Sequence, residues 1–88
     1  MTTPVTHHLK TWPQFFQLIQ DGSKTAEVRL NDRNFKAGDE LVLHEWNPET
    51  RAYTGGALLR IISHVQKLDD IPGLATTGWV LLSLHHGQ

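Results

Sequence analysis

The residues most suited to chemistry lie together in the segment Gly22–Arg29, where Lys24, Glu27 and Arg29 follow a glycine. Lys24 could bind a phosphate or act as a nucleophile or base. Glu27 could orient Lys24 or serve as a general base, and Arg29 could hold a phosphate through two parallel hydrogen bonds. The same residues also fit a plainer interpretation: an exposed cation near a helix end, and an exposed ion pair that contributes about 0–1 kcal/mol.

A short helix must come before this segment. Apolar residues at the spacing i, i+3, i+4 and i+7 predict a helix whose buried face is formed by Trp12, Phe15, Phe16 and Ile19. Thr11 is the expected N-cap, and Gly22 is the glycine expected just beyond the helix end. We therefore assign Trp12 to the core.

The segment itself continues as a strand over Thr25–Leu30. Because side chains alternate between the two faces of a strand, Ala26, Val28 and Leu30 are expected to enter the core. Glu27 and Arg29 would then lie together outside the core, on the opposite face.

Turn residues divide the rest of the chain into further strand candidates, namely Val5–Leu9, Glu40–Trp46, Ala57–Val65 and Trp79–Leu84. The last two are apolar on nearly every position, so we place them in the interior of the sheet. With the strand at 25–30, the inventory is five strands and one helix. This predicts one α+β, mostly β domain over residues 1–88: a small, mostly antiparallel barrel or strongly curved sheet, with an amphipathic helix packed on it.

Composition restricts the environment and the partners. The 88-residue chain has a formal net charge of −1, so binding of nucleic acid would require a local patch. It has no cysteine, no signal-peptide pattern at the N-terminus and no apolar run long enough to span a bilayer. We expect a cytoplasmic protein without membrane contact. The six histidines do not have the spacing of a zinc site, and no cofactor motif is present, so we predict no metal and no cofactor.

Further candidate binding residues follow the Gly22–Arg29 segment. Arg33 lies in a turn and, with Lys24, Arg29 and Lys36, completes the one dense basic group in the sequence. Trp46 ends a predicted strand and could stack on a nucleobase, although a core position at the end of the barrel explains it equally well. Asp32, beside Arg33, is best explained by the backbone hydrogen bonds that aspartate forms in turns.

Two motifs occur close together: Gly-x-Lys-x-x-Glu-x-Arg at 22–29, and Asp-Arg-x-Phe-x-x-Gly-Asp at 32–39. From His7 to Leu84 the chain resembles the ASCH-like branch of the PUA-like superfamily, and most closely a small bacterial and phage family of unknown function, DUF3850. The resemblance implies a PUA-like β-barrel, a concave site edged by residues 24–29, and an RNA or nucleotide ligand. Some ASCH relatives are amidohydrolases acting on an acylated cytidine. Lys24 matches a lysine of those enzymes, and Glu27 stands where they have a threonine.

Three functions follow as hypotheses. The first is an RNA- or nucleotide-binding module that uses Lys24, Glu27, Arg29, Arg33 and Trp46. The second is a small hydrolase, either a modified-nucleoside amidohydrolase or a ribonuclease, with Lys24 and Glu27 as catalytic residues. The third is a protein-interaction domain in which exposed tryptophan and apolar strands contact a partner.

Overall fold

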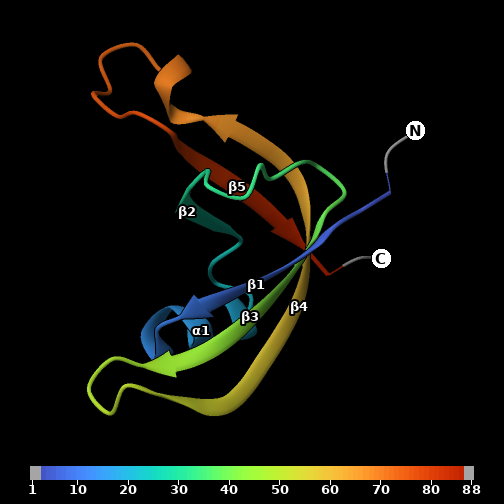
Figure 1. Cartoon of the computed structure of the whole chain (residues 1–88), viewed down its shortest axis with the longest axis vertical. Helices are drawn as coiled ribbons and strands as arrows, with labels where there is room; N and C mark the ends of the chain where they lie inside the picture. Colours follow the sequence, from blue (N-terminus) through green and yellow to red (C-terminus); the bar gives the residue numbers. More distant parts are fainter. Residues whose placement is uncertain (1–2, 87–88) are drawn as a thin grey trace.

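The computed structural model describes residues 3–86, which form a five-stranded sheet, one α-helix and one short 3-10 helix (Figure 1). In chain order the elements are β1 (Thr6–Thr11), α1 (Pro13–Gln20), β2 (Ala26–Leu30), β3 (Glu40–Asn47), β4 (Ala52–Lys67), η1 (Leu68–Asp70) and β5 (Trp79–His85). The predicted class, mostly β with five strands and one helix, is confirmed.

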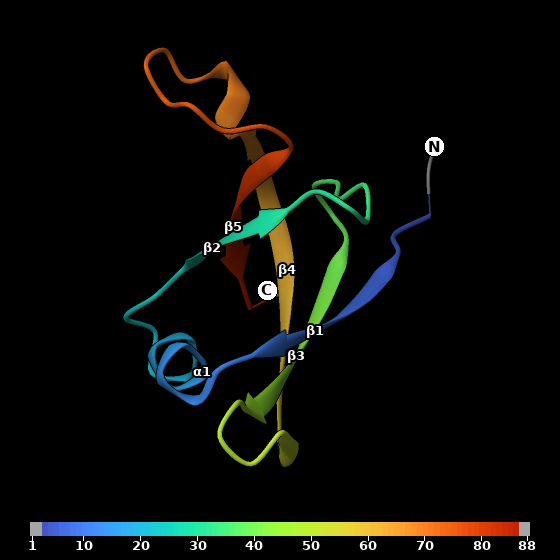
Figure 2. The same cartoon turned by 60° about the vertical axis from the view of Figure 1, so that its left-hand side comes forward.

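The strands follow the order β1-β3-β4-β5-β2 across the sheet. The pairing of β1 with β3 is parallel, and the other three pairings are antiparallel. The sheet curls strongly, as Figures 1 and 2 show, so that its two edge strands, β1 and β2, approach each other without pairing. The fold is therefore a barrel left open along one line between β1 and β2, which we call the seam.

Strand β4 occupies the middle of the sheet, as its apolar sequence predicts. It is longer than the predicted Ala57–Val65, because residues 52–56 belong to the strand as well, and Ala52 and Tyr53 pair with the end of β3. Gly56 lies close to α1 there. A Cβ atom at this position would lie 3.1 Å from the ring of Phe16, so the helix can approach β4 closely only over a glycine.

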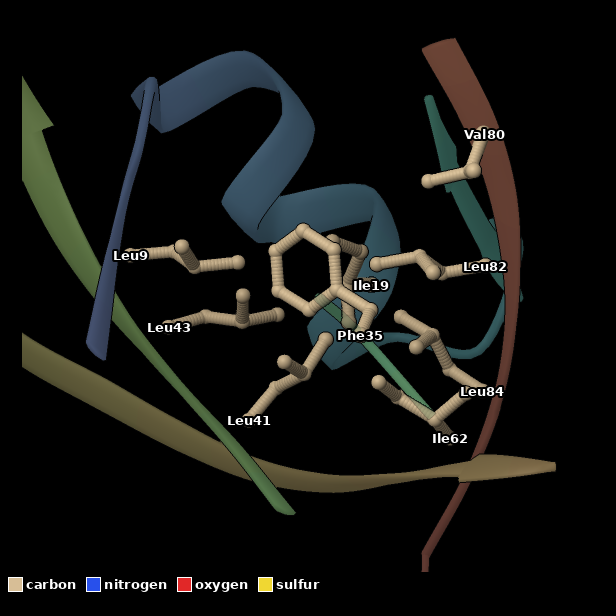
Figure 3. Close-up of a cluster of buried hydrophobic side chains, with 9 residues drawn as sticks. All are labelled: Leu9, Ile19, Phe35, Leu41, Leu43, Ile62, Val80, Leu82 and Leu84. Atoms are coloured by element: carbon tan, nitrogen blue, oxygen red, sulfur yellow. The ribbon is translucent and has the colours of Figure 1, made fainter. Parts of the chain in front are cut away.

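Apolar side chains from the concave side of the sheet form the core. Phe35, from the loop between β2 and β3, lies in the middle of this group in Figure 3 and has only 4% of its surface exposed. The buried apolar cluster comprises Leu9, Ile19, Phe35, Leu41, Leu43, Ile62, Val80, Leu82 and Leu84. Along β1, β5 and the first half of β3, buried residues alternate with less buried ones, as expected where one face of a strand lies on the core.

Helix α1 differs from the prediction at its start. Thr11 ends β1 instead of capping the helix, and the N-cap is Trp12, which makes no side-chain capping bond. Phe16 and Ile19 are buried, but Trp12 is 47% exposed and Phe15 is 42% exposed. The assignment of Trp12 to the core is therefore wrong. The curled sheet covers one side of the apolar helix face, and the other side borders the seam.

The end of α1 is held by a charged residue that the sequence analysis did not single out. Arg60, buried on β4, donates a hydrogen bond of 3.2 Å to the carbonyl oxygen of Ile19. A cation at a helix C-terminus interacts favourably with the helix dipole. Gly22 follows with a positive φ of 86°, which confirms it as the glycine that ends the helix.

Strand β2 has its two faces reversed relative to the prediction. Glu27 is 7% exposed, whereas Val28 and Leu30 are 50% and 45% exposed. The apolar side chains lie on the outer face, where Leu30 is the cross-strand partner of Trp79. The polar set faces inward because the seam supplies partners there: Lys24 for the carboxylate of Glu27, and β1 for the guanidinium of Arg29.

Over the described residues, the structure contains no helix with the length and apolar character required to cross a membrane.

Candidate functional site

A groove of about 590 Å³ lies at the seam. Its walls come from β1, the start of α1, β2, the loop that follows β2, and the first residue of β5. The lining residues with polar or aromatic side chains are Lys10, Thr11, Trp12, Phe15, Glu27, Arg29, Asp32, Arg33, Phe35 and Trp79. The groove thus brings together three of the predicted site residues, Glu27, Arg29 and Arg33.

Two arginines bridge the seam. Arg29 on β2 donates to the carbonyl oxygen of Lys10 at 3.0 Å, and Arg33 donates to that of His8 at 2.6 Å. These two carbonyl groups are two residues apart on an edge strand, so they point to the same side. Both are backbone acceptors that no neighbouring strand uses. The arginines therefore hold the open barrel together, and each guanidinium has further N–H donors for a ligand.

Glu27 lies between two cations. Its Oε2 atom is 3.6 Å from Nζ of Lys24, and its Oε1 atom is 3.6 Å from a terminal nitrogen of Arg29. Among the side chains of residues 3–86, Oε1 of Glu27 is a buried polar atom with no hydrogen-bond partner. A buried acceptor without a hydrogen bond is costly and rare in folded proteins, so Oε1 of Glu27 requires an explanation.

Lys24 does not line the groove, but it contacts Glu27, which does. Its ammonium group donates to the carbonyl oxygen of Ala26 and contacts Glu27, and its side chain is 27% exposed. The backbone N–H of Lys24 donates to the carbonyl oxygen of Leu18 at 2.9 Å, which fixes the chain between α1 and β2. The geometry gives Lys24 the role of holding the carboxylate of Glu27.

The groove contains two exposed tryptophans that the sequence analysis did not assign to a site. The sequence pattern places Trp12 in the core and Trp79 on a buried strand, whereas Trp12 is 47% exposed and Trp79 is 41% exposed. A signal for Trp79 was present, because it alternates out of phase with the buried residues Val80 and Leu82. For Trp12, its position just before the first helical residue, Pro13, was the signal, because a residue there need not share the buried helix face.

Trp46 lies elsewhere. It is on β3, opposite Tyr53 of β4, and is not among the residues that line the groove. The ammonium group of Lys10 lies 4.6 Å from the centre of the Trp46 ring and 5.9 Å from that of Tyr53. This face of Trp46 is therefore already occupied by a cation–π contact.

A second cluster of polar residues lies at the other end of β1. His7 and Asp39 are both buried, and Nε2 of His7 lies 2.9 Å from Oδ2 of Asp39. Burial raises the pKa of Asp39, but hydrogen bonds from His7 and from the backbone N–H groups of Val5 and Lys36 outweigh this and lower the pKa below its ordinary value of 3.8. We call this cluster the His7–Asp39 latch, because it ties β1 to the turn before β3.

The sequence profile of a domain of unknown function, DUF3850, matches residues 6–84. The chain belongs to the DUF3850 family. It is also similar to an uncharacterised 12.9 kDa protein from the GpA 3′ region of Escherichia phage P2, with 39% identity over 64 residues. That alignment covers 73% of this chain and 57% of the phage protein, so this chain spans little more than half the length of that relative.

The match to DUF3850 confirms the resemblance inferred from the two sequence motifs. It extends over β1 to all but the last residue of β5, and thus over every residue that lines the groove. The groove therefore lies within the part of the chain that matches the family. The wider placement in the ASCH-like branch stays a prediction.

Proposed function

We propose that this DUF3850 protein binds single-stranded RNA or a nucleotide in the groove at the seam. The observation that carries the proposal is the presence of exposed Trp12 and Trp79, together with Arg29 and Arg33, in one groove. Exposed aromatic rings can stack on nucleobases, and guanidinium groups can bind phosphates through paired hydrogen bonds.

The charge distribution supports a small or single-stranded ligand. The chain has a formal net charge of −1, so it has no overall positive charge that would attract a duplex. In the groove, Lys10, Arg29 and Arg33 are accompanied by the acidic residues Glu27 and Asp32. Such a mixed lining favours a ligand with both anionic and hydrogen-bonding groups, as a nucleotide has.

The resemblance to the ASCH-like branch supports the same ligand class. The absence of cysteine is compatible with a reducing compartment, and we propose that binding takes place in the cytoplasm.

The test is binding of the purified protein to a fluorescent single-stranded RNA, followed by anisotropy at several salt concentrations. Removing one phosphate contact should reduce the slope of log affinity against log salt by about 0.7. We expect this reduction in Arg29→Ala and in Arg33→Ala. Lys67→Ala is the matched control, since Lys67 is an exposed cation at the end of β4, outside the groove. The salt dependence of RNA binding by Lys67→Ala should have the same slope as that of the wild type.

Circular dichroism must accompany these variants, because Arg29 and Arg33 also bridge the seam. If Arg29→Ala and Arg33→Ala are folded and bind RNA with wild-type affinity, the groove is not the binding site. Failure of the wild type to bind RNA or mononucleotides at low salt would contradict the proposal as a whole.

A hydrolase is the second candidate, favoured by the contact between Lys24 and the buried carboxylate of Glu27. Glu27 could act as a general base on a ligand held in the groove. Mass spectrometry of acylated nucleosides and gels of single-stranded RNA, after incubation with pure protein, would reveal turnover. Any activity must be lost in Glu27→Ala and reduced in Lys24→Ala, since contaminating ribonuclease would be unaffected by either change.

A further inference from the structure

Glu27 is unusual because it is a buried acid with one oxygen that receives no hydrogen bond. Its residue exposure is 7%, and the side chain lies on the inward face of β2, where it lines the groove. The guanidinium of Arg29 lies 3.6 Å from Oε1. That distance is too long for a hydrogen bond.

What Oε1 lacks is a donor and not a counter-charge. Lys24 and Arg29 each lie 3.6 Å from one oxygen of the carboxylate, so two positive charges already surround it. A further cation, such as a metal ion or a ligand ammonium group, would be repelled by them. A phosphate would be repelled by the carboxylate itself. A neutral N–H or O–H group is the complement that remains.

The groove indicates which neutral donor is suitable. Glu27 shares the groove with the buried Phe35 and with the aromatic side chains of Trp12, Phe15 and Trp79. A flat heterocycle with N–H groups on its edge can pack against an aromatic ring and direct that edge to a carboxylate in the same groove. A sugar hydroxyl is a donor too, but it carries no aromatic surface.

Given the proposed function, on which this step rests, we infer that Oε1 of Glu27 accepts a hydrogen bond from the exocyclic amino group of a nucleobase. Cytosine and adenine carry such a group. Uracil has a carbonyl oxygen where cytosine has its amino group. That oxygen and the carboxylate oxygen of Glu27 are both acceptors, so they would repel each other. The groove should therefore discriminate between cytosine and uracil although the two bases have almost the same shape.

The experiment compares five-residue oligonucleotides of a single base, so that the binding register does not matter. Cytidine pentamers are tested beside uridine pentamers and beside pentamers of 2-pyrimidinone ribonucleoside, which is cytidine without the amino group. Adenosine and purine-riboside pentamers form a second pair that differs in the same way. We expect the amino-bearing member of each pair to bind about tenfold more tightly.

Two variants locate the discrimination. Glu27→Gln should bind cytidine and uridine pentamers with affinities within about twofold of each other, because an amide can accept from the amino group of cytosine or donate to the carbonyl oxygen of uracil. Glu45→Gln is the matched control: Glu45 lies on β3, accepts a hydrogen bond from Thr54 and does not line the groove. It should keep the full tenfold difference.

The outcomes separate the inference from the function on which it rests. If the wild type binds all pentamers equally, the amino-group assignment is wrong and the groove still binds RNA. If Glu27→Gln discriminates as the wild type does, another residue reads the base. If cytidine and uridine pentamers bind equally and both bind more weakly when their ribose is replaced by deoxyribose, the 2′-hydroxyl is the donor and the assignment is likewise overturned. If no pentamer binds, the proposed function fails as well.

Discussion

Glu27 and Asp39 are both buried carboxylates, but they differ in the hydrogen bonds that they receive. Asp39 accepts from the backbone N–H of Val5 at 3.1 Å, from that of Lys36 at 3.1 Å, and from His7 at 2.9 Å. Glu27 contacts two cations at 3.6 Å, and its Oε1 receives no hydrogen bond.

The difference separates a carboxylate that holds the fold from one that can serve a ligand. Asp39 has its acceptors satisfied within the protein, so removing it leaves His7 and the backbone N–H groups of Val5 and Lys36 without their acceptor. Glu27 has an acceptor left over, and a ligand donor would complete its environment. Substitutions in the latch should therefore lower stability, whereas substitutions in the groove should mainly weaken ligand binding.

The largest effect is expected for Asp39→Ala. This change breaks a buried pair and leaves three donors without their acceptor, so the free energy of unfolding should fall by about 3 kcal/mol. Urea unfolding followed by circular dichroism measures it. Asp70→Ala, at an exposed position in η1, is the control and should change stability by less than about 0.5 kcal/mol. Equal losses in the two variants would show that the latch contributes nothing special.

A somewhat smaller effect is expected on the groove side. Trp12→Ala should weaken RNA binding by about 2 kcal/mol, or roughly thirtyfold, because it removes one stacking surface. Trp46→Ala should leave the affinity nearly unchanged, since Trp46 lies outside the groove and already contacts Lys10. Anisotropy titrations with the same RNA compare the two. A greater loss in Trp46→Ala would move the binding surface to the β3–β4 hairpin.

The latch should also make stability depend on pH in the acidic range. The pKa of Asp39 is lower in the folded protein than in the unfolded chain, so ionised Asp39 contributes stability above the unfolded value, about pH 4. This contribution is lost as the pH falls through the folded-state pKa. Unfolding measured between about pH 5 and pH 3 should lose stability more steeply in the wild type than in Asp39→Asn. Parallel curves would contradict the role of Asp39.

The smallest effect on the fold is expected for Glu27→Gln. The amide has the same shape, and the replaced carboxylate loses ionic contacts of 3.6 Å but no hydrogen bond to Oε1. The free energy of unfolding should fall by about 1 kcal/mol or less. Thermal and urea unfolding provide the measurement. A loss as large as that of Asp39→Ala would mean that Glu27, too, is chiefly a structural residue.

Local patterns in the sequence were sufficient for the inventory of elements. Turn residues separated the predicted strands, and the apolar character of β4 and β5 predicted their places inside the sheet. The helix end at Gly22 followed from backbone geometry that glycine adopts at little cost. These features depend on neighbours in the chain, which a sequence displays directly.

The features that were missed depend on the curl of the sheet. Strand β2 shows a clear alternation, but alternation does not tell which face turns inward, and the seam reversed the expected choice for Glu27 and Val28. Trp12 is exposed because the sheet leaves one side of the helix uncovered. The pair of His7 and Asp39 joins residues 32 positions apart, and no local pattern encodes that contact.

The most direct test of the groove is a nuclear magnetic resonance titration with a short single-stranded RNA, read at the indole N–H signals. The chain has three tryptophans, and each has one such signal. The binding groove described above predicts that the signals of Trp12 and Trp79 shift as RNA is added, while the signal of Trp46 stays in place. A shift confined to Trp46, or no shift in any of the three, would contradict the assignment of the groove as the binding site.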